Sequence, residues 1–215
     1  MTQAPLWSFS LFGFRVRVEG GFLFVLLILA MLSPRQLQEP LYLLLMVPTV
    51  FVAILVHELG HAFTIRSFRL PVGDIVLHGM GGQVSHPVTT APRQLAISLA
   101  GPGAGLLLGG LLYGLTAVVQ VPAFLVPIAS LALFVTIGWS VFNLLPLLPM
   151  DGGQALRAGL AMVMSARNAT RIAAVATMAL AALGAIFSVQ AGEWFLAFLA
   201  LYFGYRGFAI YQEVA

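Results

Sequence analysis

The chain lacks residues on which many soluble and secreted proteins depend. No cysteine occurs among its 215 residues, which excludes a disulfide framework and any metal site built on thiolates. No lysine occurs either, so all ten basic residues are arginines, and only 8% of the residues are charged. A soluble domain carries about 25% charged residues. Because 60% of the residues are hydrophobic, the composition predicts an integral membrane protein, and the scattered arginines predict no nucleic-acid partner.

Long apolar segments predict about six transmembrane helices within a single domain over residues 1–215. The first segment, residues 21–32, is short and is also compatible with the core of a signal peptide. The other five are residues 41–65, 95–119, 123–145, 172–189 and 194–210. We therefore expect an all-α polytopic membrane protein, with a core over about residues 10–160 and C-terminal helices over about residues 170–211.

The arginines predict how these helices cross the membrane. In a six-span arrangement, nine of the ten arginines lie on the side that holds both termini and the loops after the second and fourth spans. The opposite side holds only Arg35. Because short loops rich in arginine face the cytoplasm, we expect both termini in the cytoplasm of a bacterial or archaeal cell.

Three ionisable residues interrupt the second apolar segment: His57, Glu58 and His61. An ionised side chain at the centre of such a helix costs about 2.5–3.5 kcal/mol, so polar residues there usually mark a functional site. On a helix, the two histidines project from one face about one turn apart and can bind one metal ion. Glu58 lies beside them, where it can reach a water molecule on that ion. The alternative is a buried polar network that holds helices together.

A second polar segment, residues 143–153, contains two prolines that break a regular helix. Asp151 follows them on the same side of the membrane as the two histidines, and by itself it could equally be a helix N-cap. Beside His57 and His61 it is better explained as the third ligand of a zinc site with an open position. Asn143 could form a hydrogen bond between helices, or it could donate to a carbonyl oxygen that gains charge during a reaction.

The two motifs, HELGH at residues 57–61 and NLLPLLPMDGG at residues 143–153, resemble the signature motifs of the site-2 protease family of intramembrane zinc metalloproteases. Weaker matches are Gly81-Gly82 and Ala100-Gly101-Pro102. The resemblance implies one zinc ion per chain, bound by His57, His61 and Asp151. It also implies that Glu58 is the catalytic acid and base and that Asn143 polarises the substrate.

The chain also departs from the family pattern. Many members carry an asparagine shortly after the Ala-Gly-Pro sequence of the third span, where this chain has Gly103 and Gly105. The loop between the second and third spans has about 28 residues, which is too short for the PDZ domain of the larger subgroup. Nothing after the sixth span could form a CBS domain, so the chain resembles a minimal catalytic core.

Two further stretches have the pattern of β-strands. Residues 9–18 alternate partly, with Arg15 and Arg17 on one face, and residues 72–84 contain short β-like runs broken by glycines. These stretches predict a small β element at the membrane surface. The element is either an ordinary hairpin or an exposed edge to which an extended substrate adds as another strand.

Small residues recur in the third span, where Gly101, Gly105 and Gly109 are spaced four apart. This ridge permits close approach of helices, and we interpret it as internal packing rather than an oligomer contact. The sequence predicts no oligomeric state, and the last two spans carry no recognisable chemistry.

Together these features predict a zinc metalloendopeptidase that hydrolyses a peptide bond within or near a transmembrane helix of another membrane protein. Such cleavage is regulated intramembrane proteolysis. A metal transporter and a catalytically silent, zinc-bound membrane scaffold are the alternatives. A transporter does not need Glu58 next to a metal ligand, whereas a silent scaffold would keep every motif intact.

Overall fold

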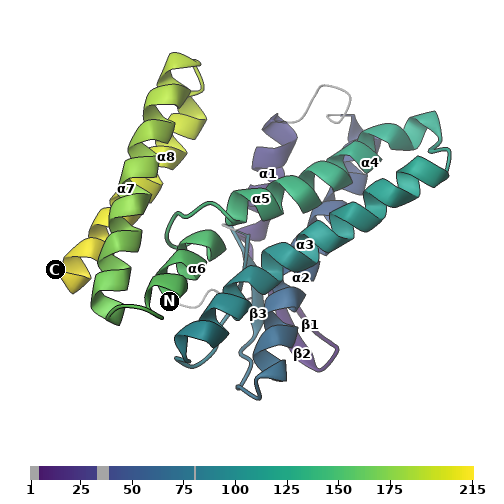
Figure 1. The fold of residues 1–215 in the computed structure, drawn as a ribbon. Coiled ribbons are helices and arrows are strands. Elements are labelled where there is room, and N and C mark those ends of the chain that lie inside the picture. The colour runs from purple at the N-terminus through teal and green to yellow at the C-terminus, as the bar shows by residue number, and fades with distance from the viewer. Residues whose placement is uncertain (1–4, 33–38, 80) are drawn as a thin grey trace. The chain divides into compact units, whose positions relative to one another are not determined.

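The computed structural model describes residues 5–32, 39–79 and 81–215 (Figure 1). Most of these residues are helical, and four short strands form a sheet, which confirms the predicted all-α membrane fold with a small β element. The helical elements are α1 (Phe22–Leu32), α2 (Pro40–Ser67), α3 (Ala91–Val118), the 3₁₀ turn η2 (Ala123–Leu125), α4 (Val126–Leu133), the π-helical turn η3 (Phe134–Gly138), α5 (Trp139–Asn143), α6 (Asp151–Leu160), α7 (Ala166–Gln190) and α8 (Trp194–Val214).

The chain folds into two compact units. Unit 1 contains residues Met1–Val88 and Ala100–Val141, and unit 2 contains residues Thr89–Leu99 and Phe142–Ala215. Unit 1 therefore includes the sheet, α1, α2, most of α3, and α4. Unit 2 includes α6, α7 and α8.

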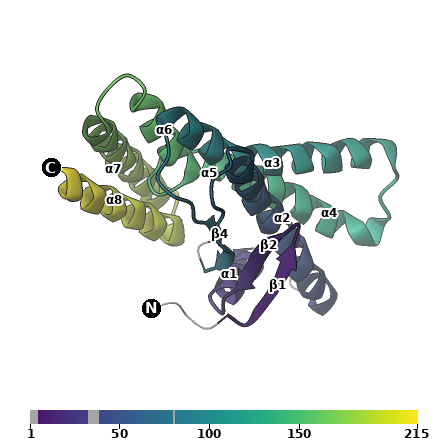
Figure 2. The same cartoon turned by 90° about the horizontal axis from the view of Figure 1, so that it is seen from below.

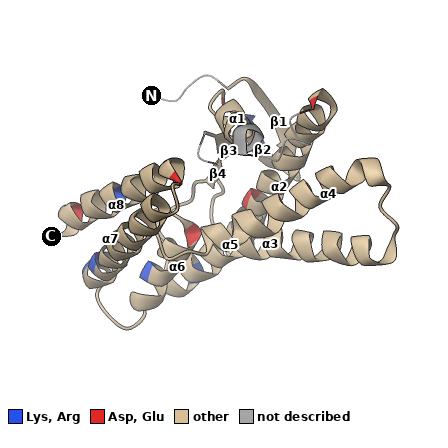
Figure 3. Cartoon of the chain, turned by 90° about the horizontal axis from the view of Figure 1, so that it is seen from above, with Lys and Arg blue, Asp and Glu red and all other residues tan. Residues whose placement is uncertain are grey.

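Five helical stretches among the described residues are long and apolar enough to cross a membrane: Pro40–Ser67, Ala91–Val118, Ala123–Asn143, Ala166–Gln190 and Trp194–Val214. Charged residues are sparse along them (Figure 3). The first of the six expected spans forms α1, which has 11 residues. A helix of that length rises only about 16 Å, roughly half of the ~30 Å hydrocarbon core of a bilayer.

The strands form one sheet in the order β1-β2-β3-β4. Figure 2 shows β1 and β2 side by side. β1 (Trp7–Leu11) pairs with β2 (Phe14–Val18) as an antiparallel hairpin, and β3 (Ile75–His78) pairs in the same way with β4 (Gly81–Val84). β2 and β3 run parallel and join the two hairpins. β2, β3 and β4 lie within the two stretches that the sequence predicted to be β, and β1 begins two residues before the first of them.

Alternation along β2 decides which face of the sheet is buried. Phe14, Val16 and Val18 are buried against the core, whereas Arg15 and Arg17 point to the opposite face. Arg17 there forms an ion pair with Asp74, with 3.6 Å between its Nη1 and the carboxylate. The pair is partly exposed, so it contributes little to stability.

The core of unit 1 lies between the sheet and α2. Ile75 and Leu77 of β3 pack with Val50 and Ile54 of α2, and α1 covers the same cluster. Near the C-terminal end of α2, Arg66 donates a hydrogen bond of 2.8 Å to the backbone oxygen of Phe12. Its guanidinium also lies over the rings of Phe14 and Phe63. The sheet is thereby attached along the C-terminal half of α2.

Glycines let α3 approach the helical stretch that follows it. A Cβ atom at Gly105 would overlap the hydroxyl of Ser140, and one at Gly109 would overlap Ile137. These contacts confirm that the glycine ridge of the third span serves internal packing. Gly103 lies on the other face of α3, where a Cβ atom would meet nothing within 4 Å.

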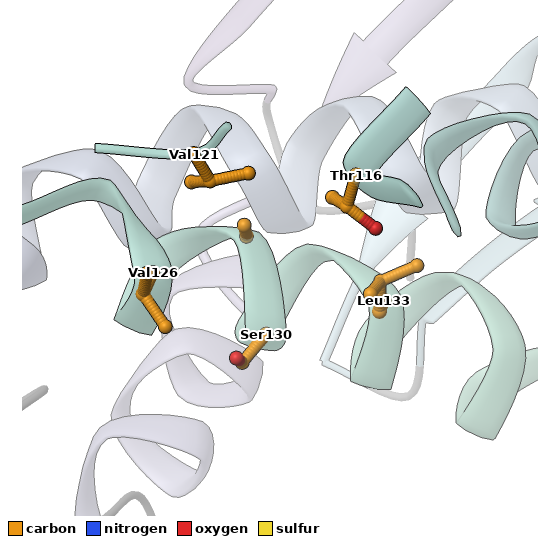
Figure 4. Close-up of a pocket in the computed structure, with 6 residues that line it drawn as sticks. Thr116, Val121, Val126, Ser130 and Leu133 are labelled. Atoms are coloured by element: carbon orange, nitrogen blue, oxygen red, sulfur yellow. The ribbon is translucent and has the colours of Figure 1, made fainter. Parts of the chain in front are cut away.

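A cavity of about 150 Å³ lies farther along the same two helical stretches (Figure 4). It is lined by Thr116, Val121, Val126, Ala129, Ser130 and Leu133. None of these side chains can accept a proton at neutral pH or act as a strong metal ligand. The cavity is therefore not a candidate for the chemistry that the motifs predict.

In unit 2, α7 and α8 form an antiparallel helical hairpin. The side chain of Ser165 caps the first turn of α7, where it accepts a hydrogen bond from the Asn168 amide. Arg167 and Arg171 donate hydrogen bonds to the carbonyl oxygens of the last two residues, Val214 and Ala215. Arginines at the C-terminal end of a helix also interact favourably with its dipole.

The glycine ridge generates a stability prediction. Gly105→Val should lower the unfolding temperature in detergent, because overpacking of a close helix contact costs about 1–3 kcal/mol. Gly103→Val is the matched control, since it makes the same substitution two residues away on the open face of α3. Equal unfolding temperatures for the two variants would contradict the packing described here.

Candidate metal centre

Helix α2 places three ionisable side chains inside unit 1. His57, Glu58 and His61 are 2%, 3% and 8% exposed. The helix continues through them because Leu59, Ala62 and Ile65 carry on its buried apolar face. Two histidines four residues apart then lie on one face, as the sequence predicted.

The two imidazole rings turn the same type of atom toward each other. His57 Nε2 and His61 Nε2 are 3.3 Å apart. Zinc binds histidine nitrogen at about 2.0–2.1 Å, so two such ligands at a tetrahedral angle are about 3.3–3.4 Å apart. The observed separation therefore fits two ligands of one zinc ion, and nitrogen is a ligand type that zinc accepts.

Helix α3 passes the site closely enough that a side chain would not fit. A Cβ atom at Gly101 would overlap the ring of His61, and one at Gly60 would overlap the backbone oxygen of Ala100. α2 and α3 thus meet backbone to backbone beside the second histidine. In the sequence Gly101 was only a weak match to a family motif, and the structure gives it a physical reason.

Glu58 lies on a different side of α2, against the sheet. A Cβ atom at Gly82 of β4 would come within about 2.5 Å of the carboxyl carbon and Oε1 of Glu58. The absence of a side chain at residue 82 therefore makes room for the carboxyl group. Glu58 and the edge strand β4 are direct neighbours.

Trp139 contributes to this region, and sequence reasoning missed it. Gly81 has a φ of +115°, a conformation that side chains rarely adopt, and a Cβ atom there would lie 2.6 Å from the Trp139 ring. Trp139 follows directly after the π-helical turn η3. Such turns often occur at functional sites, but the sequence gave no signal for one here.

The other two predicted residues, Asn143 and Asp151, lie in unit 2. Asn143 is the last residue of α5, and Asp151 is the first residue of α6. The seven residues between them are not helical, as expected from Pro146 and Pro149. Both side chains are partly buried.

The structure bears on the interpretation of Asp151 as a helix N-cap. The N-cap of α6 is Met150, whose side chain makes no capping hydrogen bond. Asp151 therefore lies in the first helical turn, where the helix dipole favours a negative charge but the carboxylate is not the cap. The glycines that follow it are required sterically, because a Cβ atom at Gly153 would lie 2.5 Å from the carbonyl carbon of Leu147.

The other two histidines of the chain, His78 and His86, lie in and after the sheet. His78 ends β3 and pairs with Gly81, and burial lowers its pKa while Glu19 raises it to a smaller extent. His86 lies in the following loop, where its Nδ1 is 2.8 Å from the backbone oxygen of Pro87. Both histidines were left out of the predicted ligand set.

Comparison with known proteins adds independent information. No model of a protein family matches the chain. The chain is 25% identical over 191 residues to a zinc metalloprotease of Methanocaldococcus jannaschii, which covers 88% of this chain and 56% of that protein. It is 34% identical over 116 residues to a Synechocystis protein provisionally named a zinc metalloprotease, which covers 50% of this chain and 29% of the relative. With Rip3 of Mycobacterium tuberculosis, also provisionally named so, it is 32% identical over 142 residues, which cover 61% of this chain and 36% of the relative.

A solved structure is also similar, the site-2 protease from Methanocaldococcus jannaschii. The match has a TM-score of 0.70 and 23% sequence identity, and it covers 95% of each chain. The chain has the site-2 protease fold. The comparisons agree with the resemblance drawn from the two motifs.

The matches cover only part of each curated relative. The chain spans between 29% and 56% of the length of these three curated relatives. These relatives are named zinc metalloproteases. The matched residues make up 88% of the present chain in the first comparison and 50% in the second.

The histidine pair of this site-2 protease fold generates a metal prediction. His61→Ala should lose most of its zinc, because one of the two facing nitrogens is removed. His86→Ala should keep a wild-type content, since it removes a loop histidine outside the predicted ligand set. Elemental analysis of the purified variants measures this, and equal zinc contents in the two would rule out His61 as a ligand.

Proposed function

We propose that the chain is an intramembrane zinc metalloprotease that hydrolyses a peptide bond within or near a transmembrane helix of another membrane protein. The observation that carries this proposal is the pair of buried Nε2 atoms, 3.3 Å apart, with Glu58 one residue away on the same helix. The zinc metalloprotease names of the relatives support it as well.

We propose one zinc ion per chain, and its proposed ligands are His57, His61 and Asp151. Each of the three offers one ligand atom of a type that zinc takes, an imidazole nitrogen or a carboxylate oxygen. Two histidines and one carboxylate leave a fourth position open, which distinguishes catalytic from structural zinc sites. A chain without cysteine cannot build the thiolate sites typical of structural zinc.

Zinc bound there supplies a Lewis acid, which polarises a carbonyl group and lowers the pKa of a coordinated water toward about 7. Glu58 is the proposed general base, which takes a proton from the attacking water and later delivers it to the leaving amine. Glu58 is buried against the sheet, so a proton on its carboxyl group is shielded from bulk water. Asn143 is proposed to donate a hydrogen bond to the substrate oxygen as that oxygen gains charge.

The substrate is proposed to bind in an extended form along β4. A helical backbone uses its own amide and carbonyl groups, so a protease must unwind a transmembrane helix before cleavage. β4 is the last strand of the sheet and directly contacts Glu58 through Gly82. An unwound segment that adds to β4 would therefore lie beside the proposed general base.

Both termini are proposed to lie in the cytoplasm. Arg66, in the last turn of α2, donates a hydrogen bond to Phe12 of the N-terminal hairpin, so the hairpin lies near the C-terminal end of α2. The linkers after α3 and after α7 contain no arginine, whereas α6, the helix before α7, contains Arg157.

The general-base assignment predicts that binding and chemistry can be separated. Glu58→Gln should keep its zinc and its fold but lose about 10²–10⁴-fold in the rate of peptide cleavage, since the proton acceptor is gone. Asp151→Asn should lose zinc as well as cleavage, because a neutral amide is a poorer ligand than a carboxylate. Cleavage of a membrane-protein substrate in detergent and elemental zinc are measured on the same samples.

Two results of that experiment decide between functions. Near wild-type cleavage by Glu58→Gln would disprove the proposed mechanism. Zinc binding by the wild type without cleavage of any tested transmembrane substrate would favour the silent scaffold instead.

The orientation is tested with reporters fused after Ala215. A reporter that is active only in the cytoplasm should be active, and one that is active only outside the cytoplasm should be silent. The opposite pair of results would contradict a cytoplasmic C-terminus.

A further inference from the structure

The segment that carries Asp151 has little regular structure of its own. Among the backbone hydrogen bonds between Asn143 and Asp151, the Leu147 amide donates to the Leu145 oxygen and the Met150 amide donates to the Leu147 oxygen. An irregular segment at membrane depth must be held by surrounding protein, because lipid offers its amide and carbonyl groups no partner. What holds this segment also determines where the Asp151 carboxylate lies.

Thr177 of α7 provides the polar part of that support. Its hydroxyl accepts a hydrogen bond of 2.9 Å from the backbone amide of Leu148 and donates one of 2.8 Å to the backbone oxygen of Ala173. Thr177 and Leu148 are 0% and 1% exposed. Bulk solvent does not reach this site, so loss of the hydroxyl would remove the hydrogen-bond partner of a buried amide.

Apolar contacts hold the same segment from both sides of Leu148. Leu147 packs with Ala181 of α7 and Phe203 of α8, and Met150 packs against the same cluster. Gly207 of α8 makes room for Thr177, because a Cβ atom there would lie 3.0 Å from the threonine methyl group. The hydroxyl of Thr177 therefore lies where α7, α8 and the Asp151 segment meet.

We propose that Thr177 is a positioning residue for Asp151: its hydroxyl fixes the Leu148 amide, three residues before the proposed zinc ligand. This inference rests on the proposed function, in which Asp151 binds zinc. It assigns a task to the C-terminal helical hairpin, for which the sequence offered no chemistry. Mutation of a group that orients a metal ligand typically lowers metal affinity 10–100-fold.

The test compares substitutions that keep or remove the hydroxyl. Thr177→Val and Thr177→Ala should bind zinc about 10-fold more weakly in competition with a chelator. Thr177→Ser should bind zinc as the wild type does. Thr170→Val is the matched control, because Thr170 lies on the same helix and its hydroxyl donates to the Ala166 oxygen of that helix. The visible spectrum of the cobalt-substituted proteins, which reports ligand geometry, should change only for Thr177→Val and Thr177→Ala.

Three results would overturn the proposal. The first is wild-type zinc affinity and an unchanged cobalt spectrum in Thr177→Val and Thr177→Ala. The second is a loss in Thr177→Ser as large as that in Thr177→Val. The third is a failure of both hydroxyl-free variants to fold, since the hydroxyl would then support α7 as a whole rather than Asp151.

Failure of the proposed function gives a different pattern. Wild-type zinc content in Asp151→Asn would remove Asp151 from the ligand set, whatever Thr177 does. Absence of peptide cleavage by a wild type whose zinc affinity depends on Thr177 would remove the protease activity but keep the positioning role.

Discussion

The structure depends on the cost of burying polar groups in a helix that is otherwise fit for lipid. His57, Glu58 and His61 lie within a 28-residue apolar helix and are almost completely buried. Such groups are tolerated inside a membrane only where protein surrounds them and where they bind one another, a metal ion or water. The sheet on one side of α2 and helix α3 on another supply that protein surround.

Glycine is the means by which both neighbours come close enough. Gly101 lets α3 pass beside the ring of His61, and Gly82 lets β4 pass beside the carboxyl group of Glu58. In each case a single methyl group would displace a side chain on which the proposed chemistry depends. The small residues of this chain therefore belong to the site as much as the ionisable ones do.

The sequence singled out His57, Glu58 and His61, because a histidine or glutamate inside an apolar run is conspicuous, and the structure buries all three side chains. The sequence also predicted the two β stretches, since Arg15 and Arg17 alternate with apolar residues on β2. It did not predict the role of Trp139 or Thr177. A tryptophan or a threonine in an apolar helix is common, and what matters about each is a contact with a residue distant in the sequence. The short first segment, residues 21–32, was already evident in the sequence, and it forms the 11-residue helix α1.

The most direct test of the central claim is X-ray absorption at the zinc edge of the purified protein. The account predicts a ligand shell with two imidazole rings at about 2.0–2.1 Å and oxygen in the remaining positions, without sulfur. This spectrum depends on the ligands themselves and not on any choice of substrate. A zinc shell without imidazole would contradict the assignment of His57 and His61, and with it the metal centre on which the proposed protease activity rests.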